Sequence, residues 1–287
     1  MIPMRDDFAC LVLCHGRPDN TPTIETLRKC HYTGKVYIVC DDEDKTVDGY
    51  RLNFGNIVEL FNKDEIAKTF DVMDSKHDKR CAVYARNACF DIAKRLGLKY
   101  FCELDDDYVG FAYRYKDGTA LRRIDDVYLD DVFEAYIEYL EISDNIYSVA
   151  FGQPGDYVGG ATSQLSKQSM VRKCMNSWIC CTDRRFTFNG TMNDDVNTFT
   201  LNGARGKLFM TFSGIMIDQP ETQREKGGMT DLYLDAVTYQ KSFYTVMCCP
   251  SFTTIKLWGD RYYRFHHSID YEIGVPKIIS DKYRRQK

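Results

Sequence analysis

The chain has 287 residues, and its 44% hydrophobic and 14% aromatic content is sufficient for the core of one large α/β domain or two small ones. Its formal net charge of −4 excludes a global positive field that recruits nucleic acid, so any DNA contact must come from local basic patches. The 12 Cys include no C-x-x-C pair, which argues against zinc and favours reduced thiols. With no export signal and no apolar run long enough to span a bilayer, we expect a cytoplasmic protein without a membrane partner.

The first part of the chain alternates between strands and helices. Residues 8–14 are continuously apolar, as in a fully buried parallel strand, and residues 35–40 and 57–61 predict two more strands. Thr21 followed by Pro22 predicts the start of an intervening helix. We therefore expect an α/β fold with a mostly parallel, Rossmann-like central sheet and helices on both faces.

Several polar residues lie where these elements end. The loop after the first strand carries Arg17 but lacks G-x-G-x-x-G, so a dinucleotide fingerprint is absent. Asp41, after the second strand, could bind a ribose or base, or belong to a solvated acidic turn. A helix predicted over residues 82–96 places Arg86 and Asn87 near its start. Helix N-termini favour anions and Arg can fork onto phosphate, so Arg86 is a candidate phosphate ligand, with a surface salt bridge as the alternative.

The most informative stretch is a predicted buried strand over residues 100–104, followed by Asp105, Asp106 and Asp107. Ligands of parallel α/β sheets bind at the carboxyl ends of the strands. Mg²⁺ or Mn²⁺ would relieve the repulsion among these carboxylates. Because side chains alternate along an extended segment, Asp105 and Asp107 can share a side while Asp106 points elsewhere. We predict a metal–phosphate site, and the alternative is a solvated acidic turn.

The second half of the chain continues this pattern. Its predicted elements are a long amphipathic helix over residues 126–142, a strand over 146–151, a strand over 208–212 that continues through 215–217, and a helix over 231–242. Asp194 and Asp195 form a second acidic pair at the start of a helix-like segment, where a purely structural helix cap is the alternative. His266 and His267 lie near the end, and such adjacent His cannot both ligate one metal as an i, i+4 pair does.

These features together resemble a GT-A nucleotide-sugar glycosyltransferase: an N-terminal α/β half, a strand ending in three Asp behind residues 84–87, a later Asp pair and a C-terminal His. More particularly, residues 15–20, 32–35 and 42–45 resemble the phage-type TET/JBP-associated glycosyltransferases. The resemblance implies a metal-dependent, hexosyltransferase-type enzyme. Its expected donor is a UDP-sugar, and its acceptor is the hydroxyl of a 5-hydroxymethylpyrimidine, 5-hydroxymethylcytosine, in phage DNA within the host cytoplasm.

The resemblance also implies a role for each candidate residue. Asp105 and Asp107, with His266 or His267, would hold Mn²⁺ or Mg²⁺, and Asp194 or Asp195 would act as general base if the reaction inverts. The implied donor-binding residues are Arg17, Asp41, Arg86, Asn87 and Asp106, and the implied acceptor-binding residues are Tyr157, Gly159, Arg224 and Lys226. One GT-A-like domain would span residues 1–287, with a nucleotide-sugar-binding half (1–110) and a C-terminal acceptor-binding half (111–287).

Other functions remain open at this point. A sugar nucleotidyltransferase would ordinarily carry a phosphate loop rich in Gly and Lys or Arg, which residues 15–20 lack. A GT-A enzyme could instead act on a glycan or protein, and a non-catalytic binding module would show no metal-dependent turnover. Basic–aromatic stretches, at residues 113–116, 122–123, 184–186 and 224–226, favour modified duplex DNA as the acceptor, with ordinary solvated surface as the alternative.

Overall fold

The protein is described by a computed structural model that covers residues 3–74, 79–163, 174–219, 240–259 and 263–275. Its main strands are β1 (Phe8–Leu13), β2 (Lys35–Asp41), β3 (Val58–Phe61), β4 (Tyr100–Asp105), β5 (Gly110–Asp117), β6 (Ala120–Ile124), β7 (Ile146–Gly152), β8 (Ser177–Cys181) and β9 (Leu208–Asp218). The helices are α1 (Pro22–Lys29), α2 (Val47–Phe54), α3 (Lys63–Ala67), α4 (Val83–Arg95), α5 (Leu129–Ile142), α6 (Asp194–Gly203), α8 (Gln240–Cys248) and α9 (Tyr271–Gly274). The strands β10 (Thr253–Trp258) and β11 (Arg264–Ile269) form a separate hairpin.

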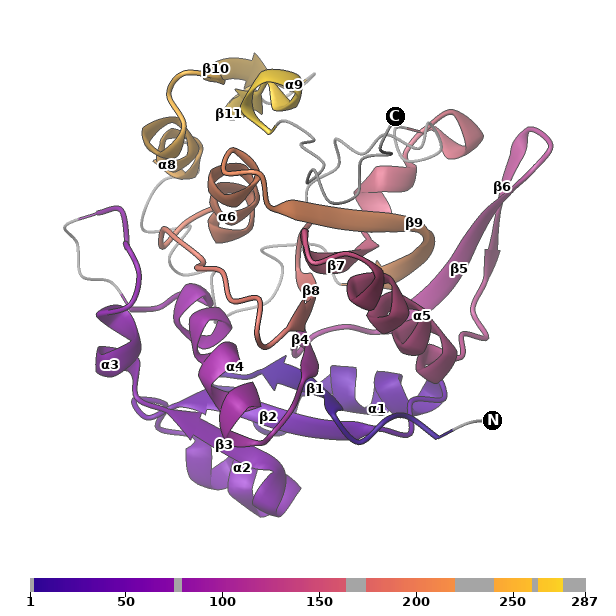
Figure 1. Cartoon of the computed structure of the whole chain (residues 1–287), viewed down its shortest axis with the longest axis vertical. Coiled ribbons are helices and arrows are strands. Elements are labelled where there is room, and N and C mark those ends of the chain that lie inside the picture. The colour runs from indigo at the N-terminus through magenta and orange to yellow at the C-terminus, as the bar shows by residue number, and fades with distance from the viewer. Residues whose placement is uncertain (1–2, 75–78, 164–173, 220–239, 260–262, 276–287) are drawn as a thin grey trace, which may run out of the picture.

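The nine main strands form one sheet in the order β3-β2-β1-β4-β8-β7-β9-β5-β6 (Figure 1). The strands β3, β2, β1 and β4 are mutually parallel. In the rest of the sheet β7 and β9 are parallel, whereas β8, β5 and β6 run antiparallel to their neighbours. The predicted α/β fold is confirmed, with the parallel order concentrated in the N-terminal strands.

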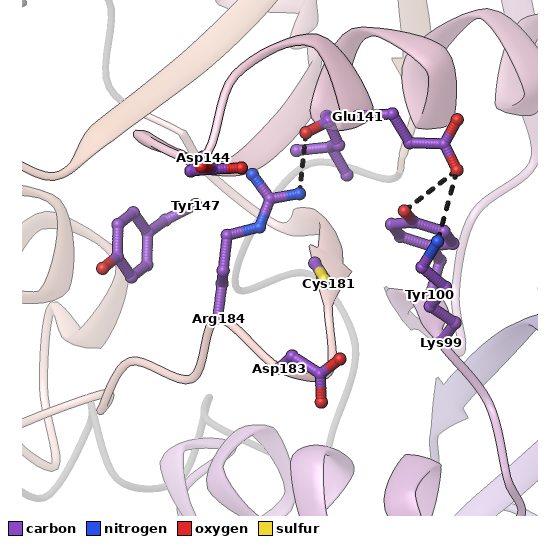
Figure 2. A pocket seen from close by; sticks show the side chains of 9 residues that line it. Lys99, Tyr100, Glu141, Asp144, Tyr147, Cys181, Asp183 and Arg184 are labelled. Atoms are coloured by element: carbon purple, nitrogen blue, oxygen red, sulfur yellow. Dashed lines mark hydrogen bonds and ion pairs between the residues drawn. The ribbon is translucent and has the colours of Figure 1, made fainter. Parts of the chain in front are cut away.

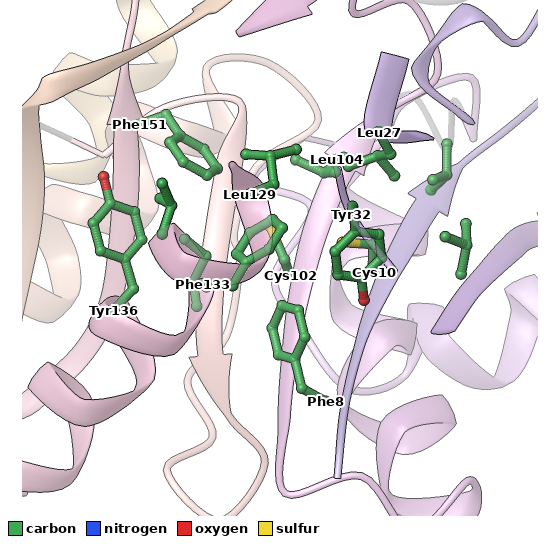
Figure 3. Packing of buried hydrophobic residues seen from close by; sticks show 14 of the residues in the cluster. Phe8, Cys10, Leu27, Tyr32, Cys102, Leu104, Leu129, Phe133, Tyr136 and Phe151 are labelled. Carbon is green, nitrogen blue, oxygen red and sulfur yellow. The ribbon is translucent and has the colours of Figure 1, made fainter. Parts of the chain in front are cut away.

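Helices cover both faces of the sheet because β1 is apolar on both sides. On one face its Phe8 packs against Phe133 of α5, in a cluster that also contains Leu27 of α1 and in which aromatic rings dominate (Figure 3). On the other face its Leu11 packs with Phe90 of α4. Each fully buried side chain of this size contributes about 1.5–3 kcal/mol of burial free energy, so the two clusters fix which helix lies on which face.

Several elements were not predicted from the sequence, among them α2, α9 and α3, which begins a stretch that the sequence suggests is a loop. Residues 110–124, which are aromatic and basic, form the hairpin of β5 and β6, and β8 inserts between β4 and β7. The β10–β11 hairpin packs near α8 and α6, in the orange and yellow part of Figure 1. The helix predicted over residues 231–242 lies largely outside the described residues, which resume with α8 at Gln240. No helix in the described part of the chain is long and apolar enough to cross a membrane.

Candidate active site

The acidic triplet lies at the carboxyl end of the parallel strands, as predicted, with Asp105 beside Leu13 at the end of β1. Two arginines hold two of its acids. Arg86 donates to Asp105 over 3.0 Å, and Arg17 donates to Asp106 over 2.5 Å. The two adjacent carboxylates therefore have different cationic partners.

Asp106 is buried, whereas Asp105 and Asp107 are partly exposed. Burial raises the pKa of Asp106 to about 7, against the opposing charge of Arg17 and with the help of its two acidic neighbours. The backbone of the triplet is fixed by Thr23 at the start of α1, whose hydroxyl donates to the Asp105 carbonyl over 2.7 Å. The triplet is thus a rigid turn, and its two partly exposed carboxylates are Asp105 and Asp107.

Arg86 is the centre of a buried carboxylate cluster. Its guanidinium lies 3.0 Å from the carboxylates of Asp105 and Asp194, and 3.8 Å from that of Glu103. Burial alone would lower the pKa of Arg86, but the three carboxylates raise it above its ordinary value. The side chain is only 4% exposed, so the geometry favours a positioning role over the predicted contact with donor phosphate.

Glu103 is a site residue that the sequence reasoning missed. It lies in the middle of β4, fully buried, and points to the same side of the strand as Asp105, toward Arg86. Burial raises the pKa of Glu103 well above its ordinary value. The available signal was a lone glutamate in an otherwise apolar strand, because a buried carboxyl needs a specific partner.

Asp194 reaches this cluster from the first position of α6. The preceding residue, Asn193, has a positive φ of 53°. Its side-chain amide donates to the Lys241 carbonyl over 2.7 Å and to the Thr245 hydroxyl over 3.1 Å, which fixes the start of α6 against α8. Burial raises the pKa of Asp194 to about 6, against the attraction of Arg86. The fold therefore brings the two predicted acidic segments together around one arginine.

Asn87 occupies a structural position. Its side chain is buried and pairs with both backbone groups of Phe188, donating to the carbonyl and accepting from the N–H, each over 3.0 Å. It also donates to the Val83 carbonyl of its own helix. These bonds tie α4 to the segment that leads into α6, so Asn87 supports the placement of Asp194 and does not face the predicted donor site.

At the ends of β1 and β2, the exposed ring of His15 lies beside two buried carboxylates. His15 lies 2.9 Å from Asp41 and 3.7 Å from Asp44, and Lys63 lies 2.8 Å from the other oxygen of Asp41. Burial would raise the pKa of Asp41, but hydrogen bonds from His15 and Lys63 outweigh it and lower the value to about 2. The His15 side chain is 54% exposed and that of Asp41 only 7%, so His15 is the group that a ligand would meet.

The predicted acceptor residues lie apart from this cluster or outside the described residues. Tyr157 is buried, and its hydroxyl donates to the Ser213 carbonyl over 3.0 Å. Gly159 lies in an exposed turn with a φ of 94°. Arg224 and Lys226 fall outside the described residues.

The two adjacent histidines of β11 have different surroundings. His267 lies 3.3 Å from the Asn193 amide, next to Asp194, whereas His266 packs edge-on against Trp258. In the described part of the chain, no three His, Cys, Asp or Glu side chains are grouped so as to hold a metal ion. A histidine ligand for the ion stays a prediction.

A pocket of about 730 Å³ lies at the other end of β4, around Tyr100 (Figure 2). There Arg184 donates to the carbonyls of Leu140, Ser143 and Ile146, each over 2.7 Å. Leu140 and Ser143 lie at the C-terminal end of α5, where a helix leaves carbonyls without partners, and Ile146 begins β7, so Arg184 ties the end of the helix to the strand. Arg184, part of a predicted basic stretch, is therefore a structural residue.

Comparison with known proteins gives a family match and several similar structures. The model of the family described as TET-Associated Glycosyltransferase matches residues 8–228. No curated protein matches the chain significantly in sequence. Solved structures with a similar fold include glucosyl-3-phosphoglycerate synthase from Mycobacterium tuberculosis, in complex with Mn²⁺, UDP-glucose and phosphoglyceric acid, at a TM-score of 0.45 and 8% identity over 93% of this chain and 91% of that one. A mannosyltransferase from Pyrobaculum calidifontis, in complex with GDP-Man and Mn²⁺, has a TM-score of 0.45 and 11% identity over 85% and 74% of the two chains.

Proposed function

Because the chain belongs to the TET-associated glycosyltransferase family, it is a glycosyltransferase with a nucleotide-sugar donor, and we propose that its acceptor is the hydroxymethyl group of 5-hydroxymethylcytosine in phage DNA. One observation supports a transfer site at the triplet more than any other. Asp105 at the end of β4 and Asp194 at the start of α6 each lie 3.0 Å from Arg86. A candidate donor-side carboxylate and a candidate base thus share one edge of the sheet, where ligands of α/β folds bind.

The donor side fits a divalent cation by the chemistry of its ligands. Asp105 and Asp107 are partly exposed and offer hard carboxylate oxygens. Mg²⁺ and Mn²⁺ need only one or two protein carboxylates, since phosphate oxygens and waters complete their coordination. When bound there, such an ion would neutralise charge on the leaving diphosphate. Arg86 holds the Asp105 carboxylate and Arg17 holds that of the neighbouring Asp106, so the turn that carries the proposed ligands is braced before the donor arrives.

The nucleoside end of the donor would lie at the ends of β1 and β2. We assign His15 there in place of the predicted Asp41, because Asp41 is buried and already engaged by His15 and Lys63. The carboxylate orients the imidazole, and the exposed ring can stack on or hydrogen-bond a base or ribose. Asp41 then acts on the donor only through His15.

On the acceptor side, Asp194 would receive the proton of the attacking hydroxyl in an inverting reaction. The acceptor oxygen bonds to the anomeric carbon, the bond from that carbon to the diphosphate breaks, and the hydroxyl proton passes to the carboxylate. A base works best when its pKa lies near the operating pH, and the pKa of Asp194 is raised to about 6. We assign this role to Asp194 rather than Asp195, because Asp194 shares Arg86 with Asp105.

The DNA acceptor is supported by the family more than by the predicted basic stretches. Arg122 is paired with Asp117, Arg123 with Asp125, and Arg185 with Asp91. Arginines that are already paired in this way offer little charge to a phosphate backbone. A base in a duplex must also be flipped out to reach the site, at a cost of a few kcal/mol.

The test is sugar transfer to defined DNA. The protein, Mn²⁺ or Mg²⁺ and a panel of nucleotide sugars would be incubated with duplexes that carry 5-hydroxymethylcytosine, 5-methylcytosine or cytosine, and the nucleosides analysed by mass spectrometry. We expect a hexose mass increment on 5-hydroxymethylcytosine alone, lost in Asp105→Asn and Asp194→Asn. Donor turnover without transfer to any duplex would keep the glycosyltransferase assignment and remove DNA as the acceptor.

A further inference from the structure

The β10–β11 hairpin carries large exposed side chains that the family match does not include. The family model ends at residue 228, before α8 and both hairpin strands. Trp258 is 59% exposed, and Leu257 and Phe265 are exposed on the other face of the hairpin. Exposed aromatic and aliphatic side chains of this size can mark an interaction surface.

The chemistry of the two strands is cationic and aromatic. Their sequences, TTIKLW and RFHHSI, contain no acidic residue in a chain whose net charge is −4. Lys256 pairs directly with His266 across the hairpin, and the ring of His266 packs against that of Trp258 at 5.4 Å. Side chains on one face of a strand alternate with a period of two, so Lys256 and Trp258 point to the same side.

The basic side chain of Lys256 on this hairpin differs in its ion pairing from those of the β5–β6 hairpin, which is also basic and aromatic. In the β5–β6 hairpin, Arg122 and Arg123 are each paired with a carboxylate. Lys256, in contrast, is exposed and forms no ion pair with any residue in the described ranges. An exposed ammonium next to an exposed indole is the combination that binds a nucleic-acid strand, through phosphate and base stacking respectively.

The hairpin contacts the residue that precedes α6, the helix that carries Asp194. His267 of β11 lies 3.3 Å from the amide of Asn193, and Asn193 immediately precedes Asp194 at the start of α6. The Ser242 hydroxyl of α8 donates to the Phe265 carbonyl over 3.1 Å. This bond ties the hairpin to α8, the helix that also holds the Asn193 side chain. The hairpin is therefore anchored to the element that presents the proposed base through the face that carries His267, and Lys256 and Trp258 lie on its other face.

We propose that the side of the β10–β11 hairpin that carries Lys256 and Trp258 binds the acceptor DNA, with a nucleobase stacked on Trp258 and a phosphate beside Lys256. This inference rests on the proposed function, because it assumes that DNA is the acceptor. It adds a surface outside the active site, on the hairpin face opposite His267, that would hold part of the strand. The occupant is a DNA strand because this side combines an exposed indole with a positive charge, and neither strand carries an acid.

The first test uses the two tryptophans of the chain. Trp178 is fully buried and Trp258 is 59% exposed, so the fraction of emission that acrylamide can quench reports on Trp258. Adding a 5-hydroxymethylcytosine duplex oligonucleotide, without donor, should protect this fraction from acrylamide. An unchanged quenching constant at saturating oligonucleotide would overturn the proposal.

The second test measures affinity for the same duplex by fluorescence anisotropy at several salt concentrations. Trp258→Ala should weaken binding about 5- to 150-fold, the equivalent of ~1–3 kcal/mol for one stacked base, and Trp258→Phe should restore part of it. Lys256→Ala should lower the log–log salt slope by about 0.9, the value for one phosphate contact. Matched controls are Leu52→Ala and Lys94→Ala, which remove an exposed apolar side chain and an exposed lysine elsewhere and should leave both quantities unchanged.

Two further measurements separate this inference from the proposed function. If the wild-type protein transfers sugar to 5-hydroxymethylcytosine and both hairpin variants do so with an unchanged KM for DNA, the hairpin proposal is wrong and the proposed function stands. If the wild type turns over donor but neither binds nor modifies DNA, the proposed acceptor is wrong. Dimerisation in sedimentation that Trp258→Ala abolishes, with DNA affinity unchanged, would assign the surface to a second copy of the chain instead.

Discussion

Arg86 determines how the two acidic segments of the site lie relative to each other. Its guanidinium contacts Asp105 on β4 and Asp194 on α6, and removing it would leave these buried or partly buried carboxylates without their cation. We expect Arg86→Ala to lower the free energy of unfolding by about 3–5 kcal/mol, the range for breaking a buried ion pair. Urea denaturation with a common m-value measures this loss.

Arg86→Lys and Arg17→Ala are the informative comparisons. A lysine keeps the charge but lacks the planar fork whose separate nitrogens contact Asp105 and Asp194, so we expect a smaller loss of stability and a lower kcat. Arg17 is partly exposed, and its loss should weaken binding of the nucleotide sugar by about 1.5–3 kcal/mol in calorimetry if it also contacts phosphate. A stable Arg86→Ala protein with impaired donor affinity would restore the phosphate-contact interpretation of Arg86.

The three acids of the triplet should differ in their effect on activity. Asp105→Asn and Asp107→Asn each remove a proposed metal ligand, and we expect transfer to fall at least about a hundredfold, since a Lewis-acid contact provides several kcal/mol. Asp106→Asn should be milder, because its carboxylate is buried against Arg17. Turnover of nucleotide sugar across a Mn²⁺ titration checks the order, and equal activity in all three variants would contradict the metal assignment.

His15 should contribute stability that depends on pH. Its hydrogen bond to Asp41 raises the pKa of His15, so the charged pair is fully formed below about 6.5, the ordinary histidine value, and is lost as pH rises through the raised one. The pKa of Asp41 is lowered to about 2, so its contribution is lost only as pH falls from about 4 toward that value. The stability difference between wild type and His15→Asn should therefore be largest near pH 5 and vanish at alkaline pH. Urea midpoints across this range test it, and a difference that grows with pH would contradict it.

At the scale of elements, the position of α6 depends on its ties to α4 and α8. Asn87 of α4 holds both backbone groups of Phe188, ahead of α6. Asn87→Ala would leave these buried groups unpaired, at about 1–3 kcal/mol each, and would loosen the start of α6. We expect kcat to fall while the KM for the nucleotide sugar stays the same. A selective rise in that KM, at unchanged stability, would support the predicted donor-binding role instead.

The elements that the sequence predicted well are those with a strong local pattern. The apolar run of β1, the Pro22 start of α1 and the acids after β4 all lie where the sequence analysis placed them. The strand β8 was missed because its five residues, SWICC, are a short apolar run that a buried helix segment could also show. Glu103 and Arg86 illustrate a different limit. Local patterns identify a charge, but only the packing of α4 on β4 shows that the two charges meet inside the protein.

The N-terminal and C-terminal parts of the chain share one core. Val275, after α9, is buried in the same cluster as Phe90 of α4 and Leu11 of β1. The ring of Tyr271 packs edge-on against Phe199 of α6 at 5.7 Å. The C-terminal segment thus completes the burial of the helix that carries Asp194, although the family match ends before it. We therefore propose that the described chain unfolds as a single unit.

Calorimetry tests this directly. One domain should give one transition, with the calorimetric enthalpy equal to the van't Hoff enthalpy. Val275→Ala removes about two buried carbon atoms, so we expect a loss of about 1.5 kcal/mol and a fall in Tm of roughly 2–6 °C for the whole transition.

A chain that ends at residue 239 would lack α8, the hairpin and α9, and would expose Phe199 and the side chain of Asn193. It should therefore melt well below the full chain and lose transfer activity. Two separate transitions, or a truncated chain with an unchanged Tm, would instead make the C-terminal segment an independent unit, and its link to Asp194 through Asn193 would then carry no stability.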